Sequence, residues 1–168
     1  MIIIAHRGNV NGPNTAVGGE NTVAAIKHAL AQGYDVEIDV LDIDDNGIFY
    51  LGHDVVDEMI DYHSGFNRWI FQSRRIILHG KTFRAATKLL KMKQNYQIYN
   101  DFFFHNTDKF ALTDSGWLWM YPNPMEIFDS TLPIIDVLPE IYEKRYYKDS
   151  LPLGICTDFP ELYNKEYN

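Results

Sequence analysis

The chain has 168 residues, of which 46% are hydrophobic and 23% charged, enough for one domain with a real core but short for two. The formal net charge of −8 argues against a general affinity for nucleic acid, and no apolar run is long enough to span a membrane. The single cysteine, Cys156, excludes an internal disulfide and favours a reducing, cytoplasmic compartment. We therefore expect residues 1–168 to form one domain.

The beginning of the chain reads as a strand, a loop and a helix. Residues 2–5, IIIA, predict a buried strand that runs into a polar, glycine-rich loop. A helix is expected from about residue 22 to residue 32, with its apolar stripe formed by Val23, Ile26 and Leu30. Strand followed by helix is the first half of a βαβ unit.

The same alternation continues as far as residue 95. An acid-bearing strand begins near residue 34, and Asn46-Gly47 between two apolar runs predicts a hairpin. Residues 75–81 predict another strand, and residues 82–93 a helix. The residues expected to face the core from that helix are Phe83, Ala86 and Leu90. Strands that alternate with helices favour a parallel sheet.

Beyond residue 95 the apolar segments are short and leave little room for helices. They are YQIY, FFFH, WLWMY, LPIIDVL and LPLGICTDFP, the last being a buried strand that runs into a loop. We expect short turns to replace helices here. The aromatic residues of FFFH and WLWMY are expected mainly in the core, with one ring at a substrate pocket. The charged stretch EKRYYK at 143–148 is expected to be a solvated face.

The strand near residue 34 carries acids on one face. Because side chains alternate along a strand, Asp35, Glu37 and Asp39 share one face and the intervening aliphatic residues share the other. Buried, unpaired carboxylates are costly, so something must offset their repulsion. Two explanations are open: a bound divalent cation, or an edge strand with one solvated face.

The following segment, DIDDNG, raises the possibility of a calcium loop. Asp42, Asp44, Asn46 and Gly47 match the first six positions of an EF-hand, but His53 occupies the twelfth, where a bidentate glutamate is needed. The residues between also read as a strand. We interpret DIDDNG as a solvated hairpin turn.

Polar residues cluster where the expected strands end. In parallel α/β folds, active sites are assembled at the carboxyl edge of the sheet. Four groups fall at or near such positions: His6 with Arg7, Glu37 with Asp39, His53 with Asp54, and His79 with Lys81. Asp158 follows the last expected strand and either reaches this edge or caps a turn. The grouping predicts a functional site.

Five motifs in the first third of the chain occur in a familiar order. They are HRG at 6–8, ENT at 20–22, the Glu37-x-Asp39 strand, the turn DDNG at 44–47, and HD at 53–54. Their order and spacing resemble the glycerophosphodiester phosphodiesterase family. Weaker similarities follow in IILHGK, where the family has a Glu-x-Lys strand, and in GICTDFP, where it has a TDxP-like ending.

This resemblance implies a TIM-type (β/α) barrel, here shortened, with some helices reduced or missing. It also implies a metal-dependent phosphodiesterase acting on glycerophosphodiester-like or other small phosphodiester substrates. By position, the catalytic histidines are His6 and His53, the phosphate-binding residues Arg7 and Lys81, and two metal ligands Glu37 and Asp39. Glu20 and Asp54 are expected to orient neighbours at the site. His105, which ends FFFH, is a further candidate at a strand end.

The third metal ligand is where this chain departs from the family. His79 stands in place of a carboxylate, on the same strand face as Lys81. The expected cofactor is a divalent cation, Mg²⁺, Ca²⁺ or Mn²⁺, and an imidazole ligand would favour a softer ion. The alternative is that His79 only binds the phosphate. Two other functions stay open: a phosphate-ester-binding domain without catalysis, or a phosphodiesterase that releases a cyclic phosphate.

Overall fold

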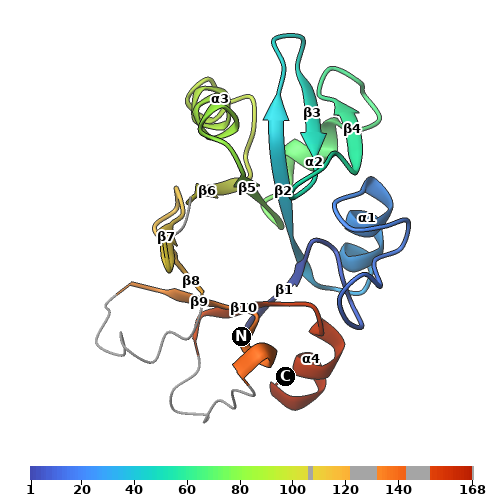
Figure 1. The fold of residues 1–168 in the computed structure, drawn as a ribbon, viewed down its shortest axis with the longest axis vertical. Coiled ribbons are helices and arrows are strands. Elements are labelled where there is room, and N and C mark those ends of the chain that lie inside the picture. The colour runs from blue at the N-terminus through green and yellow to red at the C-terminus, as the bar shows by residue number, and fades with distance from the viewer. Residues whose placement is uncertain (106–107, 122–131, 143–151, 168) are drawn as a thin grey trace.

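The computed structural model describes residues 1–105, 108–121, 132–142 and 152–167, and in them ten strands form one curled sheet (Figure 1). The strands are β1 (Ile2–His6), β2 (Asp35–Ile43), β3 (Ile48–Leu51), β4 (Glu58–Asp61), β5 (Ile76–Gly80), β6 (Asp101–Phe104), β7 (Phe110–Leu112), β8 (Leu118–Met120), β9 (Ile134–Val137) and β10 (Gly154–Thr157). The helices are α1 (Val23–Ala31), α2 (Arg68–Gln72), α3 (Phe83–Gln94), α4 (Pro160–Tyr167) and the short 3-10 helix η2 (Pro139–Tyr142).

Parallel pairing joins the strands that carry the predicted polar ends. β1 lies between β10 and β2, and β5 lies between β2 and β6, all in parallel register. β9 is parallel to both β10 and β8. The carboxyl ends of these strands therefore meet at one edge of the curled sheet.

Antiparallel hairpins make the sheet mixed. The predicted hairpin at Asn46-Gly47 is present: β2 continues past β1 and β5 and pairs antiparallel with β3, which pairs with β4. β7 and β8 form a second antiparallel pair. In Figure 1 the β2–β3 hairpin extends as an arm beyond the rest of the sheet.

The expected TIM-type (β/α) barrel is wrong. The sheet is a curled, mixed half-barrel with few helices, and no strand pairing between β6 and β7 is present in the described residues. The reason is visible in the second half of the chain, where the described residues between β6 and β10 contain three strands but no helix other than the short η2. A (β/α)₈ barrel typically needs about 250 residues, and this chain replaces helices with hairpins and turns.

The expected faces of two helices are only partly correct. α1 is capped by Thr22, whose side chain accepts a hydrogen bond from the Ala25 amide, and it buries Ile26 as predicted. α3, however, buries Ala85 and Leu89, whereas Phe83 and Leu90 are exposed. The apolar stripe of α3 is thus shifted by one position. Periodicity alone did not separate the two registers, because both stripes carry apolar residues.

Two apolar clusters lie on opposite faces of the curled sheet. The larger one packs residues such as Val36, Ile38 and Leu78 against the helices. The smaller one lies on the inner face and consists of Ile4, Ile77, Phe103, Ala111, Trp119, Ile135, Val137 and Cys156. The inner cluster fills the curled sheet below its carboxyl edge, so this edge rests on a packed base.

The predictions about membrane-spanning segments and about the charged stretch have different outcomes. Among the described helices, none is both long and apolar enough to cross a membrane. The charged stretch at 143–148 lies outside the described residues.

Candidate functional site

A pocket of about 240 Å³ opens at the carboxyl edge of the sheet and brings most of the predicted residues together. Its polar lining consists of His6, Arg7, Glu37, Asp39, His53, His79, Lys81 and His105. Its apolar lining comes from the other side of the sheet and consists of Trp119, Tyr121, Val137 and Leu138. The volume lies below the usual range of drug-sized ligand pockets, about 300–1,000 Å³, and suits a small substrate.

Strand register explains why the polar residues are neighbours. His6 pairs with Glu37 across β1 and β2, and Asp39 pairs with His79 across β2 and β5. Partners in register point to the same face of a sheet. Lys81 follows His79 by two residues and faces the same pocket.

Arg7 lies in a strained backbone conformation directly after β1. Its φ is 53°, in the left-handed region that non-glycine residues rarely adopt, and Gly8 follows with a φ of 80°. A Cβ on Gly8 would lie 2.6 Å from the Ala25 Cβ, so only glycine lets this turn pack on α1. The turn aims the Arg7 amide at Glu37 Oε2, 3.2 Å away. Strain of this kind is commonly found at functional sites.

Asp39 is surrounded by cations. Its side chain is 1% exposed, and its oxygens lie 2.9 Å from Arg7 Nε, 3.0 Å from His79 Nδ1 and 3.8 Å from Lys81 Nζ. Burial favours the neutral acid, but the His79 hydrogen bond and the charges of His79, Arg7 and Lys81 hold the Asp39 pKa well below its usual range. These side chains offset the repulsion between Glu37 and Asp39 that the sequence raises.

His79 is the centre of the candidate metal site. Glu37, Asp39 and His79 are buried, and one ligand atom from each lies within 4.8 Å of the others. This group could hold a metal ion, and the mixed donors suit a divalent transition metal. Since His79 Nδ1 hydrogen-bonds Asp39, a cation bound there would have to replace the shared proton.

The surroundings of the His79 ring suit it to bind either a metal ion or a phosphate. Burial lowers the His79 pKa, but hydrogen bonds to Asp39 and Glu37 outweigh this effect and the pKa is raised. Its Nε2 is buried without a hydrogen-bond partner, which leaves one ring nitrogen uncommitted. The ring stacks on two neighbours from the same side, Phe103 at 4.4 Å and His105 at 4.8 Å between ring centroids. This stacking fixes the ring plane, as a metal or phosphate ligand requires.

His6 is oriented by Asp158. Its Nδ1 lies 2.9 Å from Asp158 Oδ1, and with an ionised Asp158 this nitrogen carries the proton. Burial lowers the His6 pKa, but the Asp158 hydrogen bond and the charges of Glu37 and Asp158 raise it overall. Burial opposes ionisation of Asp158, yet its contacts with His6 lower its pKa. Asp158 therefore reaches the site rather than only capping a turn.

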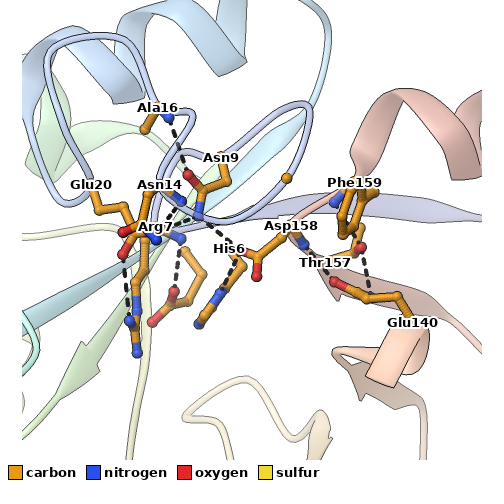
Figure 2. A network of polar contacts seen from close by, with 12 residues as sticks. His6, Arg7, Asn9, Asn14, Ala16, Glu20, Glu140, Thr157, Asp158 and Phe159 are labelled. Atoms are coloured by element: carbon orange, nitrogen blue, oxygen red, sulfur yellow. Dashed lines mark hydrogen bonds and ion pairs between the residues drawn. The ribbon is translucent and has the colours of Figure 1, made fainter. Parts of the chain in front are cut away.

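A second tier of polar contacts surrounds His6 and Arg7 (Figure 2). Glu20 Oε2 lies 3.4 Å from Arg7 Nη1, in the position predicted for it. Glu140, from η2, accepts hydrogen bonds from the Asp158 amide and the Thr157 hydroxyl, both at 2.9 Å. Burial raises the Glu140 pKa. Sequence reasoning missed Glu140, since it lies in a single short 3-10 turn with no motif.

The remaining predicted residues lie at the margin of the pocket. His53 is at its rim, with its Nδ1 2.8 Å from Asp54 Oδ2, and Asp54 is 86% exposed. His105 lines the pocket; burial and the His79 charge lower its pKa. Asp35, the third acid of the strand, is outside the site and is half-buried against Arg75, with its Oδ1 2.8 Å from Arg75 Nε.

The aromatic group divides between core and pocket, as its sequence suggested. Phe103 and Trp119 stack at 4.5 Å in the inner cluster, and Trp119 with Tyr121 also lines the pocket. Tyr121 is 41% exposed. The pocket wall formed by β8 and β9 is thus apolar and aromatic, opposite the charged wall of β1, β2 and β5.

A larger cavity lies near the amino ends of β6 and β8, but three of the four charged side chains that line it already have partners within it. It has a volume of about 880 Å³. Lys93 Nζ lies 3.0 Å from Asp114 Oδ2, and Asp101 accepts a hydrogen bond from Ser115. Since these groups satisfy one another, the cavity offers less to a ligand than the smaller pocket does.

Comparisons of the chain with protein-family models, with curated proteins and with solved structures give no match. The chemistry of the site must therefore be argued from its own residues.

Proposed function

We propose that the chain is a metal-dependent phosphodiesterase acting on small phosphodiesters, and that it is a divergent relative of the glycerophosphodiester phosphodiesterases. One observation carries the proposal: two histidines, two cationic side chains and a Glu-Asp-His group line one pocket of about 240 Å³. The resemblance of five sequence motifs to that family supports the same conclusion.

Arg7 and Lys81 supply the phosphate site in this proposal. Both line the pocket, and both already lie beside Asp39, so they form a cationic surface at a fixed place. A phosphodiester carries one negative charge, which grows on its non-bridging oxygens in the transition state. A divalent cation held by Glu37, Asp39 and His79 would add Lewis-acid stabilisation of those oxygens.

His6 is the better-supported general base of the two histidines. Asp158 holds its Nδ1 and thereby leaves Nε2 to accept the proton of the attacking hydroxyl. In this proposal His53, which lines the pocket and is partly exposed, protonates the departing alkoxide. Two imidazoles with such different surroundings can divide the acid and base tasks.

The test is turnover of bis(4-nitrophenyl) phosphate and of glycerophosphocholine by the full chain. Both should be cleaved with added Mg²⁺, Mn²⁺, Ca²⁺ or Zn²⁺, and a chelator should abolish cleavage. Phosphorus NMR of the products separates hydrolysis from release of a cyclic phosphate. Calorimetric binding of glycerophosphocholine without turnover by any metal would instead favour the phosphate-ester-binding alternative. Arg7 and His79 already neutralise Asp39 without a metal ion, and this observation supports the phosphate-ester-binding alternative.

A further inference from the structure

We propose that Asn9 is a positioning residue that sets both His6 and Arg7, by holding the two carboxylates on which they rest. No motif assigned it a role. The kinetic part of this inference rests on the proposed function, and its structural part does not. Asn9 lies in the loop after β1 and is 0% exposed. Figure 2 shows its amide between Glu20 and the His6–Asp158 pair.

Every hydrogen-bonding group of the Asn9 side chain is engaged. Its Nδ2 donates to Glu20 Oε1 at 2.6 Å and to Asp158 Oδ1 at 2.8 Å. Its Oδ1 accepts from the amides of Thr15 and Ala16, at 3.2 Å and 3.1 Å. A primary amide offers two donor hydrogens and an acceptor with two lone pairs, so this arrangement uses its full capacity.

The two carboxylates explain why an amide is required. The pKa of Glu20 is lowered although burial opposes this, because Asn9, Asn14 and Arg7 stabilise its anion. The Asp158 pKa is lowered as well. Two anions therefore flank one position, and a neutral donor with two N–H groups satisfies both. A carboxylate there would repel both, and an aliphatic side chain would leave two buried acceptors unsatisfied.

The contacts of Asn9 reach the reacting groups in one further step. Asp158 Oδ1 accepts from both Asn9 Nδ2 and His6 Nδ1, so the amide fixes the oxygen that holds the imidazole. On the other branch, Glu20 Oε1 is held by Asn9 while Oε2 faces Arg7. Asn9 thus couples the candidate base to the candidate phosphate-binding cation without lining the pocket itself.

A matched pair of substitutions tests this role. Asn9→Asp removes both donors with almost no change of shape. Asn100→Asp makes the same change at another asparagine that is 0% exposed, whose Nδ2 donates to the carbonyls of Ile70, Ser73 and Ile76 near the opposite end of the sheet. We expect Asn9→Asp to lower kcat for bis(4-nitrophenyl) phosphate about 10- to 100-fold. Asn100→Asp should lower the melting temperature but leave kcat unchanged.

A double-mutant cycle separates positioning from general destabilisation. Because Asn9 acts in part through His6, Asn9→Asp should lower the rate by a smaller factor in a His6→Ala background than in the wild type, and the remaining loss comes from the Arg7 branch. Asn9→Ser, with its matched Asn100→Ser, replaces the first pair if the aspartate variant does not fold. Equal losses of kcat at the two asparagines, or full additivity with His6→Ala, would overturn the inference.

An NMR arm does not depend on turnover. The Nδ1 proton of His6, hydrogen-bonded to Asp158, should give a downfield signal in the folded chain that disappears in His6→Ala. We expect Asn9→Ser to shift or broaden this signal and Asn100→Ser to leave it in place. An unchanged signal in Asn9→Ser would refute the positioning role even if no phosphodiester is cleaved. A perturbed signal without turnover would support Asn9 while rejecting the proposed phosphodiesterase.

Discussion

Two layers on the inner face of the curled sheet differ in chemistry although the same strands build both. Ile4 in β1, Ile77 in β5 and Cys156 in β10 pack into the inner apolar cluster. Two residues further along the chain come His6 in β1, His79 in β5 and Asp158 directly after β10. Because side chains repeat their direction every second residue, each pair points the same way at different depths.

The difference shows how the molecule separates stability from chemistry. The apolar layer removes hydrocarbon from water and fixes the strands in register, which favours folding. The polar layer buries Glu37, Asp39 and His79, whose desolvation opposes folding unless they are paired. The comparison predicts that changes in the polar layer affect chiefly activity and that changes in the apolar layer affect chiefly stability.

The largest effect is expected from His6 in the polar layer. His6→Ala should lower kcat/KM for bis(4-nitrophenyl) phosphate by about 10²- to 10⁴-fold, because it removes the proposed general base. The control is His28→Ala, a half-buried histidine on α1 outside the pocket. Steady-state rates of the two variants measure the difference. Full activity in His6→Ala would remove His6 from the mechanism and erase the contrast between the layers.

The apolar layer should respond in stability instead. Ile77→Ala, at a side chain that is 1% exposed, is expected to lower the free energy of unfolding by about 2–5 kcal/mol. Val17→Ala, at a residue that is 48% exposed, should change it by less than about 0.5 kcal/mol. Urea denaturation measures both. A loss at Ile77 no greater than at Val17 would contradict a packed inner cluster.

The His6–Asp158 pair should stabilise the fold most within a limited range of pH. The pKa of His6 is raised above 6.5, so its contribution is complete below about pH 6.5 and is lost as pH rises through the raised value. The pKa of Asp158 is lowered from 3.8, so its contribution is complete above about pH 3.8 and is lost as pH falls further.

Asp158→Asn should therefore cost most between these limits, about 1–3 kcal/mol, and less on either side. Urea midpoints of the wild type and the variant across pH give the comparison. Turnover should move in the opposite direction at high pH, since the base must be neutral: kcat/KM should rise as pH passes the raised His6 pKa. A cost of Asp158→Asn that does not vary with pH would argue against an ionic pair.

The smallest expected effect concerns the choice of metal. His79→Glu converts the candidate ligand set to three carboxylates, which hard cations prefer. Activation by Mg²⁺ or Ca²⁺ relative to Mn²⁺ or Zn²⁺ should increase by about tenfold, a difference of roughly 1.4 kcal/mol. Titrations of each metal against rate supply the measurement. An unchanged ranking would mean that His79 is not a ligand.

Local patterns predicted the site better than they predicted the fold. The positions of His6, Glu37 and His79 on one face of their strands depend only on short apolar runs and period-two alternation, and these residues do meet in one pocket. The barrel was wrong because closure depends on how the second half of the chain pairs, and three-residue strands such as β7 and β8 leave almost no periodic signal.

Asn9 and Glu140 show a different limit of sequence reasoning. Both contact Asp158, which is 149 residues from Asn9 and 18 residues from Glu140. Neither Asn9 nor Glu140 belongs to a motif that would have pointed to this contact. An asparagine in a polar, glycine-rich loop is ordinarily read as a turn residue. Only the tertiary structure reveals that its side-chain amide is fully buried and donates hydrogen bonds to two carboxylates.

The reactivity of Cys156 reports how often the curled sheet opens. The thiol lies in the inner cluster, is 0% exposed, and has a pKa raised well above the usual value by burial and by nearby carboxylates. Such a thiol is inert while the sheet stays curled, because only an exposed thiolate reacts with an alkylating reagent. Cys156 is the sole cysteine of the chain, so alkylation of the protein requires that the strands beneath the site separate. The rate of labelling therefore measures this local opening.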